Sequence, residues 1–194
     1  MQPLAMTWPY ALVFWAVFLW AFSQEFPVVS KRANPTAGAQ DAGSRRLIMI
    51  CQPLAIVAAF MIAADVRSAT LPHRMWLFWA GLASIVLGSL LRRHCFRMLG
   101  KSFTGAVIVR TDQAVVERGA YRYVRHPSYT GGTLMFLGIG LALGNGLGLL
   151  VLAAMTAGVY GYRVAVEERA LAATIGEPYR SYMRRTKRFI PFVF

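Results

Sequence analysis

Two polar clusters bracket a long apolar stretch in the second half of the sequence. Residues 125–129 read Arg-His-Pro-Ser-Tyr before it, and Arg163, Glu167 and Glu168 follow it. Together they offer cations, carboxylates, an imidazole and a phenol, which suit the binding of a charged small molecule beside a second reactant. Ionisable side chains are costly at membrane depth, so their concentration in an apolar region indicates a functional site.

The spacing of the clusters predicts that they meet. Pro127 and Arg163 each lie 18 residues from Asn145 (145 − 127 and 163 − 145), in the turn sequence Gly-Asn-Gly at 144–146. If antiparallel helices flank that turn, a rise of ~1.5 Å per residue brings both clusters to the same depth. Pro127 suits the first turn of a helix, so the free backbone N–H groups of residues 128–130 would face the same place.

Each cluster taken alone also has a purely structural interpretation. His126 and Tyr129 would be interfacial anchors at a helix start, while Arg163 and Glu167, four residues apart, would pair on one face of a helix end. Glu168 lies on another face, where it would hold a second cation or none. Their convergence at one depth is what favours a site.

The elements that must position these residues are apolar and long. The 194 residues are 57% hydrophobic, with a mean hydropathy of +0.47. Runs able to cross ~30 Å of hydrocarbon lie at about 4–22, 47–64, 75–91, 128–143 and 147–165. Since open strand edges are not tolerated in lipid, we expect an all-α integral membrane protein with about five transmembrane helices. The last two would form a C-terminal helical hairpin.

The distribution of charge predicts the orientation of the chain. The net charge is +13, and all of the 21 Lys and Arg residues except Arg67 and Arg74 fall in loops or tails on one side. The positive-inside rule makes that side cytosolic, with the N-terminus outside and the C-terminus and both polar clusters inside. The run at 4–22 lacks a basic flank, so we expect a retained span rather than a signal peptide. Membrane topology explains the basicity, and no nucleic-acid partner is expected.

The remaining segments are shorter. Residues 101–125 read as an extended or hairpin-like connector ending at Gly119, and an amphipathic helix is expected over 167–175 with a stop at Gly176. Pro178 would start a further amphipathic turn in the cytosolic tail, with Tyr179, Tyr182 and Met183 on one face. The histidines and cysteines share no metal-ligand spacing, so no metal site is expected.

At these residues the sequence resembles the isoprenylcysteine carboxyl methyltransferase family, within a wider superfamily of membrane phospholipid methyltransferases. The resemblance covers residues 98–194, a methyltransferase core, whereas 1–97 match only as generic N-terminal transmembrane helices. The matching pieces are Gly119-Ala120-Tyr121, the run 125–129 with Gly131, Arg163, Glu167-Glu168, Gly176-Glu177-Pro178-Tyr179, Tyr182 and Arg188-Phe189-Ile190-Pro191.

The resemblance implies S-adenosylmethionine as cofactor and assigns roles to particular residues. Glu167 would hold a polar group of the cofactor and Arg163 would meet the methyl acceptor, with Glu167 or Glu168 as base if the acceptor must lose a proton. The expected cofactor-binding residues besides Glu167 are Gln113, Ala114, Val115, Val116, Tyr121, His126, Pro127, Ser128 and Tyr129. Expected partners are membrane lipids and a lipophilic or lipidated acceptor, such as a prenylcysteine-type carboxylate, a phospholipid amine or a thiol.

Other interpretations remain open at this point. Membrane sterol and steroid reductases, which use NADPH, share a similar helix start, but their motif commonly continues with Glu where this chain has Gly132. A small non-enzymatic scaffold would bind no cofactor at all. Eukaryotic members of the resembled family often carry an acidic run where Ala165 and Val166 precede Glu167. This difference favours a prokaryotic inner or plasma membrane and leaves the acceptor undecided.

Overall fold

The computed structural model describes residues 2–23, 25, 41–100, 109 and 115–190. Within these ranges the chain forms six α-helices and no β-sheet, which confirms the all-α class. They are α1 (Tyr10–Phe22), α4 (Ser44–Asp65), α5 (Arg74–Leu99), α6 (Pro127–Leu143), α7 (Gly146–Thr174) and α8 (Glu177–Arg185).

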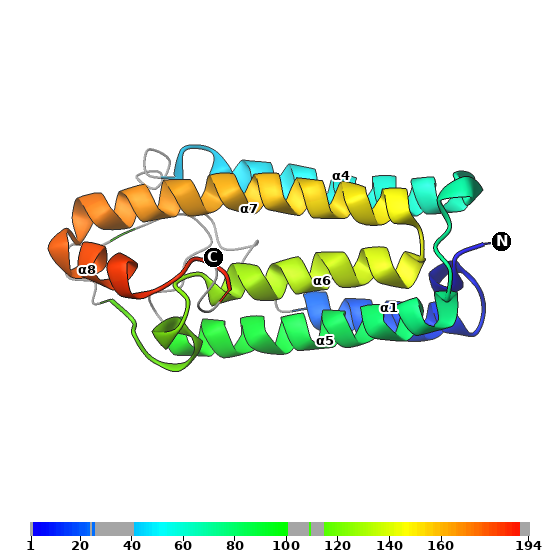
Figure 1. Ribbon diagram of the computed structural model, residues 1–194, viewed down its shortest axis with the longest axis horizontal. Coiled ribbons are helices and arrows are strands. Elements are labelled where there is room, and N and C mark those ends of the chain that lie inside the picture. Colours follow the sequence, from blue (N-terminus) through cyan, green and yellow to red (C-terminus); the bar gives the residue numbers. More distant parts are fainter. Residues whose placement is uncertain (1, 24, 26–40, 101–108, 110–114, 191–194) are drawn as a thin grey trace.

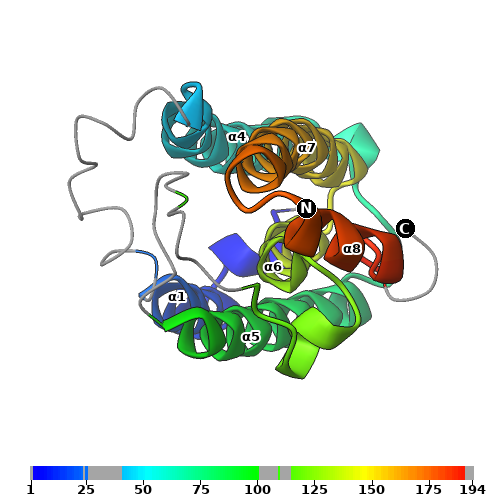
Figure 2. The same ribbon diagram turned by 90° about the vertical axis from the view of Figure 1, so that its left-hand side faces the viewer.

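Five of these helices run along the long axis of the molecule, and α8 lies across one end (Figure 1). Seen from that end, α6 lies between a layer of α4 and α7 and a layer of α1 and α5 (Figure 2). The core that joins the layers is apolar and aromatic, with Phe14, Phe78, Ile85 and Ile139 fully buried. The turn between α6 and α7 and the start of α6 therefore lie at opposite ends of the bundle.

Three helices, α4, α5 and α7, are long and apolar enough to cross a membrane by length and composition. The fold is that of a multi-pass integral membrane protein. The helices α1 and α6 have 13 and 17 residues and are shorter. The apolar run at 4–22 is not one helix, because Leu4–Met6 forms a separate 3-10 turn and Pro9 precedes α1. Proline lacks the backbone N–H that a continuous helix would need there.

Two helices extend beyond the apolar runs that suggested them. α5 continues to Leu99 rather than ending near 91, and α7 continues to Thr174 rather than 165. The amphipathic segment expected over 167–175 is therefore mostly the last part of α7 and not a separate helix. No Gly or Pro separates the apolar part of α7 from its polar end, so nothing interrupts the helix. Gly176, at φ +74°, ends it as expected.

About half of the connector expected over 101–125 lies outside the described residues. Its described end forms a 3-10 turn at Gly119–Arg122, which leads directly into the start of α6. Val109 is also described, and it packs with Val166 near the polar end of α7.

Glycines allow α5 and α6 to pack at backbone contact. A Cβ atom on Gly138 would lie 2.6 Å from the carbonyl oxygen of Gly81, and one on Gly88 would overlap the carbonyl oxygen of Gly131. Small residues at this spacing let membrane helices approach closely, where dispersion and interhelical contacts replace the missing hydrophobic driving force. Because Gly131 lies in the first turns of α6, this packing fixes the position of the start of α6 against α5.

This packing can be tested with two alanine substitutions. Gly88→Ala should destabilise the protein by about 1–3 kcal/mol, because the new methyl group forces the two backbones apart. Gly158→Ala is the control: a Cβ at Gly158 meets no atom within 4 Å, so that substitution should stabilise the helix slightly. Thermal unfolding in detergent measures both, and equal melting temperatures would contradict the packing described.

Candidate active site

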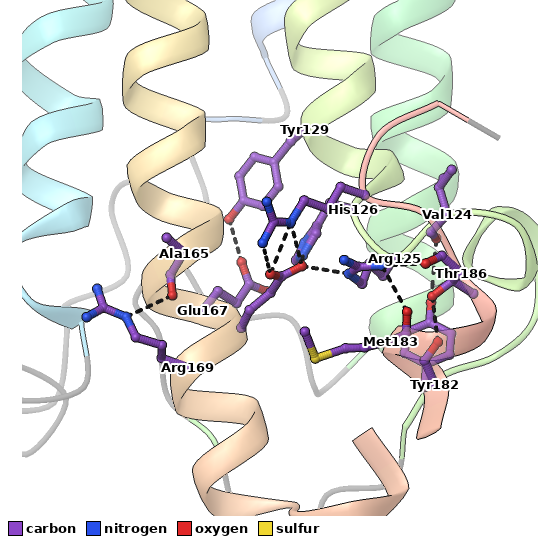
Figure 3. A network of polar contacts seen from close by, with 12 residues as sticks. Val124, Arg125, His126, Tyr129, Ala165, Glu167, Arg169, Tyr182, Met183 and Thr186 are labelled. Carbon is purple, nitrogen blue, oxygen red and sulfur yellow. Dashed lines mark hydrogen bonds and ion pairs between the residues drawn. The ribbon is translucent and has the colours of Figure 1, made fainter. Parts of the chain in front are cut away.

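The two polar clusters meet at the end of the bundle where α6 begins. Arg163 Nε on α7 donates a hydrogen bond to the Tyr129 hydroxyl at 3.1 Å, and that hydroxyl donates to Glu167 Oε2 at 2.8 Å. The shared depth predicted from the spacing around Asn145 is thus confirmed. The expected pair of Arg163 and Glu167 is bridged by a phenol from the facing helix, and Figure 3 shows the contact of that phenol with Glu167.

Glu168 is the common partner of a second set of contacts. Its carboxylate is 5% exposed and accepts hydrogen bonds from Arg125 Nε at 2.6 Å and Arg188 Nη2 at 2.8 Å. His126 Nε2 lies 3.2 Å from the same carboxylate. The sequence left the partner of Glu168 undecided. The structure shows three partners, two just before α6 and one near the end of the chain.

Residues 186–189, here called the C-terminal strap, lie along the start of α6. The backbone N–H groups of Arg125 and His126 donate to the carbonyl oxygens of Lys187 and Arg188, at 2.9 and 3.0 Å. Thr130 Oγ1 donates to the carbonyl oxygen of Phe189 at 2.8 Å. The strap therefore pairs with residues 124–126 as a short strand would, in parallel. The sequence analysis identified Arg188 and Phe189 as part of a motif but did not predict this pairing.

Arg163 is buried and has partners at the start of α4 and just before it. Its exposed fraction is 4%, and its Nη1 donates to Asp41 Oδ1 and, at 2.7 Å, to Ser44 Oγ. Asp41 Oδ2 also accepts from the backbone N–H of Arg45 at 2.9 Å. Sequence reasoning missed Asp41 and Ser44, although Asp41 is the one charged residue of the Pro/Ala/Gly-rich sequence 34–44.

A second buried arginine supports the first turn of α6. Arg92 on α5 forms two hydrogen bonds of 2.7 Å with the carboxylate of Glu25 and donates from Nη1 to the carbonyl oxygen of Ser128 at 3.0 Å. The sequence analysis used Arg92 only as one of the cations that predict the orientation in the membrane. Glycine is required at position 132, since a Cβ there would collide with the Tyr160 hydroxyl and crowd Arg92.

Two tyrosines of α8 face this end of the bundle, as the amphipathic pattern predicts. The Tyr182 hydroxyl donates to the carbonyl oxygen of Tyr121 at 2.6 Å. The Tyr179 hydroxyl is buried and has no hydrogen-bond partner within the described part of the chain. Burial and the nearby carboxylates of Glu168 and Glu167 raise the pKa of Tyr179, so its phenol remains a neutral hydrogen-bond donor.

The other residues expected at the site are distributed around these contacts. Tyr121, His126, Pro127 and Ser128 are buried, whereas Tyr129, Val115 and Val116 are half-buried. Gln113 and Ala114 lie outside the described residues. Among the residues that the structure describes, no group of three or more His, Cys, Asp or Glu side chains is arranged to hold a metal ion.

Comparison with known proteins gives these contacts a family context. Residues 76–177 match the family model described as Phospholipid methyltransferase. Protein-S-isoprenylcysteine O-methyltransferase B of Arabidopsis thaliana is 30% identical over 125 residues, which is 63% of this chain and 64% of that protein. The Schizosaccharomyces pombe protein-S-isoprenylcysteine O-methyltransferase is 31% identical over 116 residues, 59% of this chain and 49% of that protein. The chain thus spans less than two thirds of the length of either relative.

A solved structure has the same fold over nearly the whole chain. It is that of the eukaryotic intramembrane Ras methyltransferase ICMT, isoprenylcysteine carboxyl methyltransferase. The TM-score is 0.63 at 21% identity, and the alignment covers 98% of this chain and 80% of that one.

The pairing of Arg163 with Asp41 predicts a large effect of one substitution on stability. Asp41→Ala should destabilise the protein by about 3–5 kcal/mol, because it leaves a buried guanidinium without its carboxylate. Glu177→Ala is the control: its ion pair with Arg184 joins side chains that are 67% and 64% exposed, so the melting temperature should not change. Thermal unfolding of both variants in the same detergent is the measurement. A similar small shift for both would show that Asp41 does not compensate the charge of Arg163.

Proposed function

The chain belongs to the phospholipid methyltransferase family, and from this premise we propose that it transfers methyl groups from S-adenosylmethionine to a lipophilic acceptor at a membrane. The acceptor class that the relatives favour is a prenylcysteine-type carboxylate. The observation that carries the proposal is the bridge Arg163–Tyr129–Glu167, in which a cation and a carboxylate contact one phenol hydroxyl. A methyl donor and an anionic acceptor need such a pair.

The residues present fit a cationic, hydroxyl-bearing cofactor. S-adenosylmethionine supplies a methyl group on a sulfonium, which is already activated for displacement. Glu167 is half-buried, and the neutral Tyr129 hydroxyl is its hydrogen-bonded neighbour, so its charge suits a cationic or hydroxyl group. The buried Tyr179 hydroxyl offers a donor.

The assignments taken from the family resemblance form the remainder of the proposed cofactor site. Tyr121 and residues 126–129 would form its wall, and 113–116 would contribute backbone groups. His126 contacts Glu168, and the Ser128 carbonyl accepts from Arg92. Because these polar groups are already in contact with other residues, His126 and Ser128 would contribute mainly shape and backbone to the wall.

The contacts distinguish the roles proposed for the two glutamates. Both carboxylate oxygens of Glu168 accept hydrogen bonds from arginines, so Glu168 positions Arg125 and Arg188 and has little capacity to accept a proton. Glu167 bonds a neutral hydroxyl, and it is the better base if the acceptor is an amine or thiol. A carboxylate acceptor needs no base. It needs a guanidinium to orient it, and orientation can contribute ~7–11 kcal/mol.

Arg163 is the guanidinium proposed to orient the acceptor. Nη1 is already anchored by Asp41 and Ser44, so the planar group is held before the acceptor arrives. An arginine fixed in this way loses little side-chain entropy on binding, which favours precise placement of the acceptor oxygen over simple charge attraction.

We also propose five membrane crossings, with the N-terminus outside and the C-terminus and site in the cytosol. Glu25 and Asp41 come from the first loop, and both contact arginines at the end where α6 begins. The strap from the C-terminal tail lies at the same end. The first loop, the segment before α6 and the C-terminal tail, which are all rich in cations, therefore share one end of the bundle. This shared position supports the orientation predicted from charge.

Titration of the purified protein with S-adenosylhomocysteine and with NADPH tests the proposed cofactor. Isothermal titration calorimetry should detect binding of S-adenosylhomocysteine and none of NADPH. Glu167→Gln should weaken S-adenosylhomocysteine binding by about 10–100-fold, the loss of one charge-assisted hydrogen bond. Glu177→Gln, an exposed glutamate on α8, is the matched control. Unchanged affinity in Glu167→Gln would count against the cofactor role of this residue.

The role of Arg163 can be separated from cofactor binding with a conservative variant. Arg163→Lys keeps a positive charge for Asp41 but loses the planar fork, so S-adenosylhomocysteine affinity should persist. With a farnesylcysteine carboxylate as acceptor, KM should rise or kcat fall by about tenfold or more, as expected when one charged hydrogen bond is lost. Phosphatidylethanolamine, assayed in parallel, tests the lipid-amine alternative. Turnover equal to that of the parent protein would exclude acceptor placement by Arg163.

A further inference from the structure

A strongly basic hollow lies beside the C-terminal strap, outside the contacts proposed for methyl transfer. It has a volume of about 340 Å³, and five cations line it: Arg125, Arg184, Arg185, Lys187 and Arg188. No carboxylate is part of its lining. We call this feature the basic hollow.

The cations of the basic hollow outnumber the carboxylates that contact them. Glu168 is shared by Arg125 and Arg188, while Glu177 pairs with Arg184 and Glu117 with Arg185. Five cations therefore share three carboxylates, and Lys187 has no ion-pair partner within the described ranges. The side chains of Arg184, Arg185 and Arg188 are 64%, 59% and 45% exposed. The excess positive charge is thus accessible to an anion.

The position of the hollow along α7 places it at the level of lipid headgroups. Glu168, which anchors Arg125 and Arg188, lies 23 residues from Asn145 (168 − 145) on the single helix α7, or ~34 Å along its axis. At the other end, Arg74 lies beside Gly144, so that turn is at the opposite membrane boundary. With ~30 Å of hydrocarbon between, the hollow lies just beyond the second boundary.

Exposed apolar side chains flank the cations. Tyr123 is 54% exposed two residues before Arg125, and Ile190 is 52% exposed two residues after Arg188. Cations next to an exposed aromatic and an exposed aliphatic side chain are typical of segments that lie in the interface between headgroups and acyl chains. An acidic soluble peptide would make no use of these apolar groups.

We propose that the basic hollow binds the phosphate headgroup of an anionic phospholipid in the cytoplasmic leaflet. The phosphate oxygens would accept hydrogen bonds from Lys187 and the exposed arginines, and the acyl chains would lie against Ile190 and Tyr123. Because the strap is hydrogen-bonded to residues 125 and 126, a lipid bound to Lys187 and Arg188 also holds the strap against the start of α6. The leaflet follows from the proposed orientation, whereas the binding itself does not depend on methyl transfer.

Lipid retention measured by native mass spectrometry tests this site directly. Protein purified in a neutral detergent is titrated with phosphatidylglycerol and, separately, phosphatidylcholine, and phosphatidylglycerol should bind more tightly. Each basic residue near a membrane surface is worth about fivefold in affinity for anionic lipid. Lys187→Gln should therefore weaken phosphatidylglycerol binding about fivefold, and Lys187→Gln with Arg184→Gln about 25-fold.

The control removes the same charge from the same end of the molecule. Arg46→Gln with Arg97→Gln changes two exposed cations that do not line the hollow, and phosphatidylglycerol binding should be unchanged. Lys187 is exposed and outside every ion pair described, so its single variant should fold normally even if the double variant does not. Circular dichroism and size-exclusion chromatography verify this.

Four results would overturn the proposal. The first is equal binding of phosphatidylglycerol and phosphatidylcholine, and the second is a loss of phosphatidylglycerol binding in the control equal to that in the Lys187→Gln variants. The third is displacement of the lipid by inorganic phosphate at the lipid's own concentration. The fourth is tighter binding of an oligoglutamate peptide than of the lipid. The third would indicate a site for free phosphate and the fourth an acidic protein partner. Selective loss in the Lys187→Gln variants, with the control unchanged, would support a lipid site.

Discussion

The buried carboxylate of Glu168 is the constraint on which the polar end of this bundle depends. A charge that is 5% exposed must be paired and hydrogen-bonded, since its desolvation costs several kcal/mol. Glu168 meets this need with Arg125 and His126 at the start of α6 and with Arg188 of the strap. Three segments far apart in the sequence are thereby fixed around one side chain, and the site forms where they meet.

Two further ion pairs, one buried and one part-buried, repeat this arrangement. Asp41 and Arg163 are separated by 122 residues, and Glu25 and Arg92 by 67. Buried ion pairs contribute little net stability, but removing one partner is strongly destabilising, so they specify one arrangement of the helices. In each pair the acid is matched by an arginine. Glu167, whose described hydrogen bond is to a neutral phenol, is left as the carboxylate suited to an external cation.

The sequence predicted the parts of this arrangement that depend on distance along one helix. Equal spacing of Pro127 and Arg163 from Asn145 was enough to bring the clusters together, because the rise of a helix is fixed. The length of α7 was underestimated, since hydropathy reports where lipid ends and not where a helix ends. Contacts of Asp41 with Arg163, and of the strap with residues 124–126, join segments through tertiary packing, and no local pattern encodes them.

The segments that hold the site lie partly outside the region shared with the family. The matched region covers residues 76–177, which includes Arg163 and Arg92 but excludes their partners Asp41 and Glu25. It also excludes the strap that pairs with the start of α6. Arg163 and Arg92, which lie inside the matched region, are therefore positioned here by contacts from outside it. Because the guanidinium proposed to meet the acceptor is anchored by Asp41, a substitution in the segment before α4 can shift that guanidinium without altering any residue of the matched region.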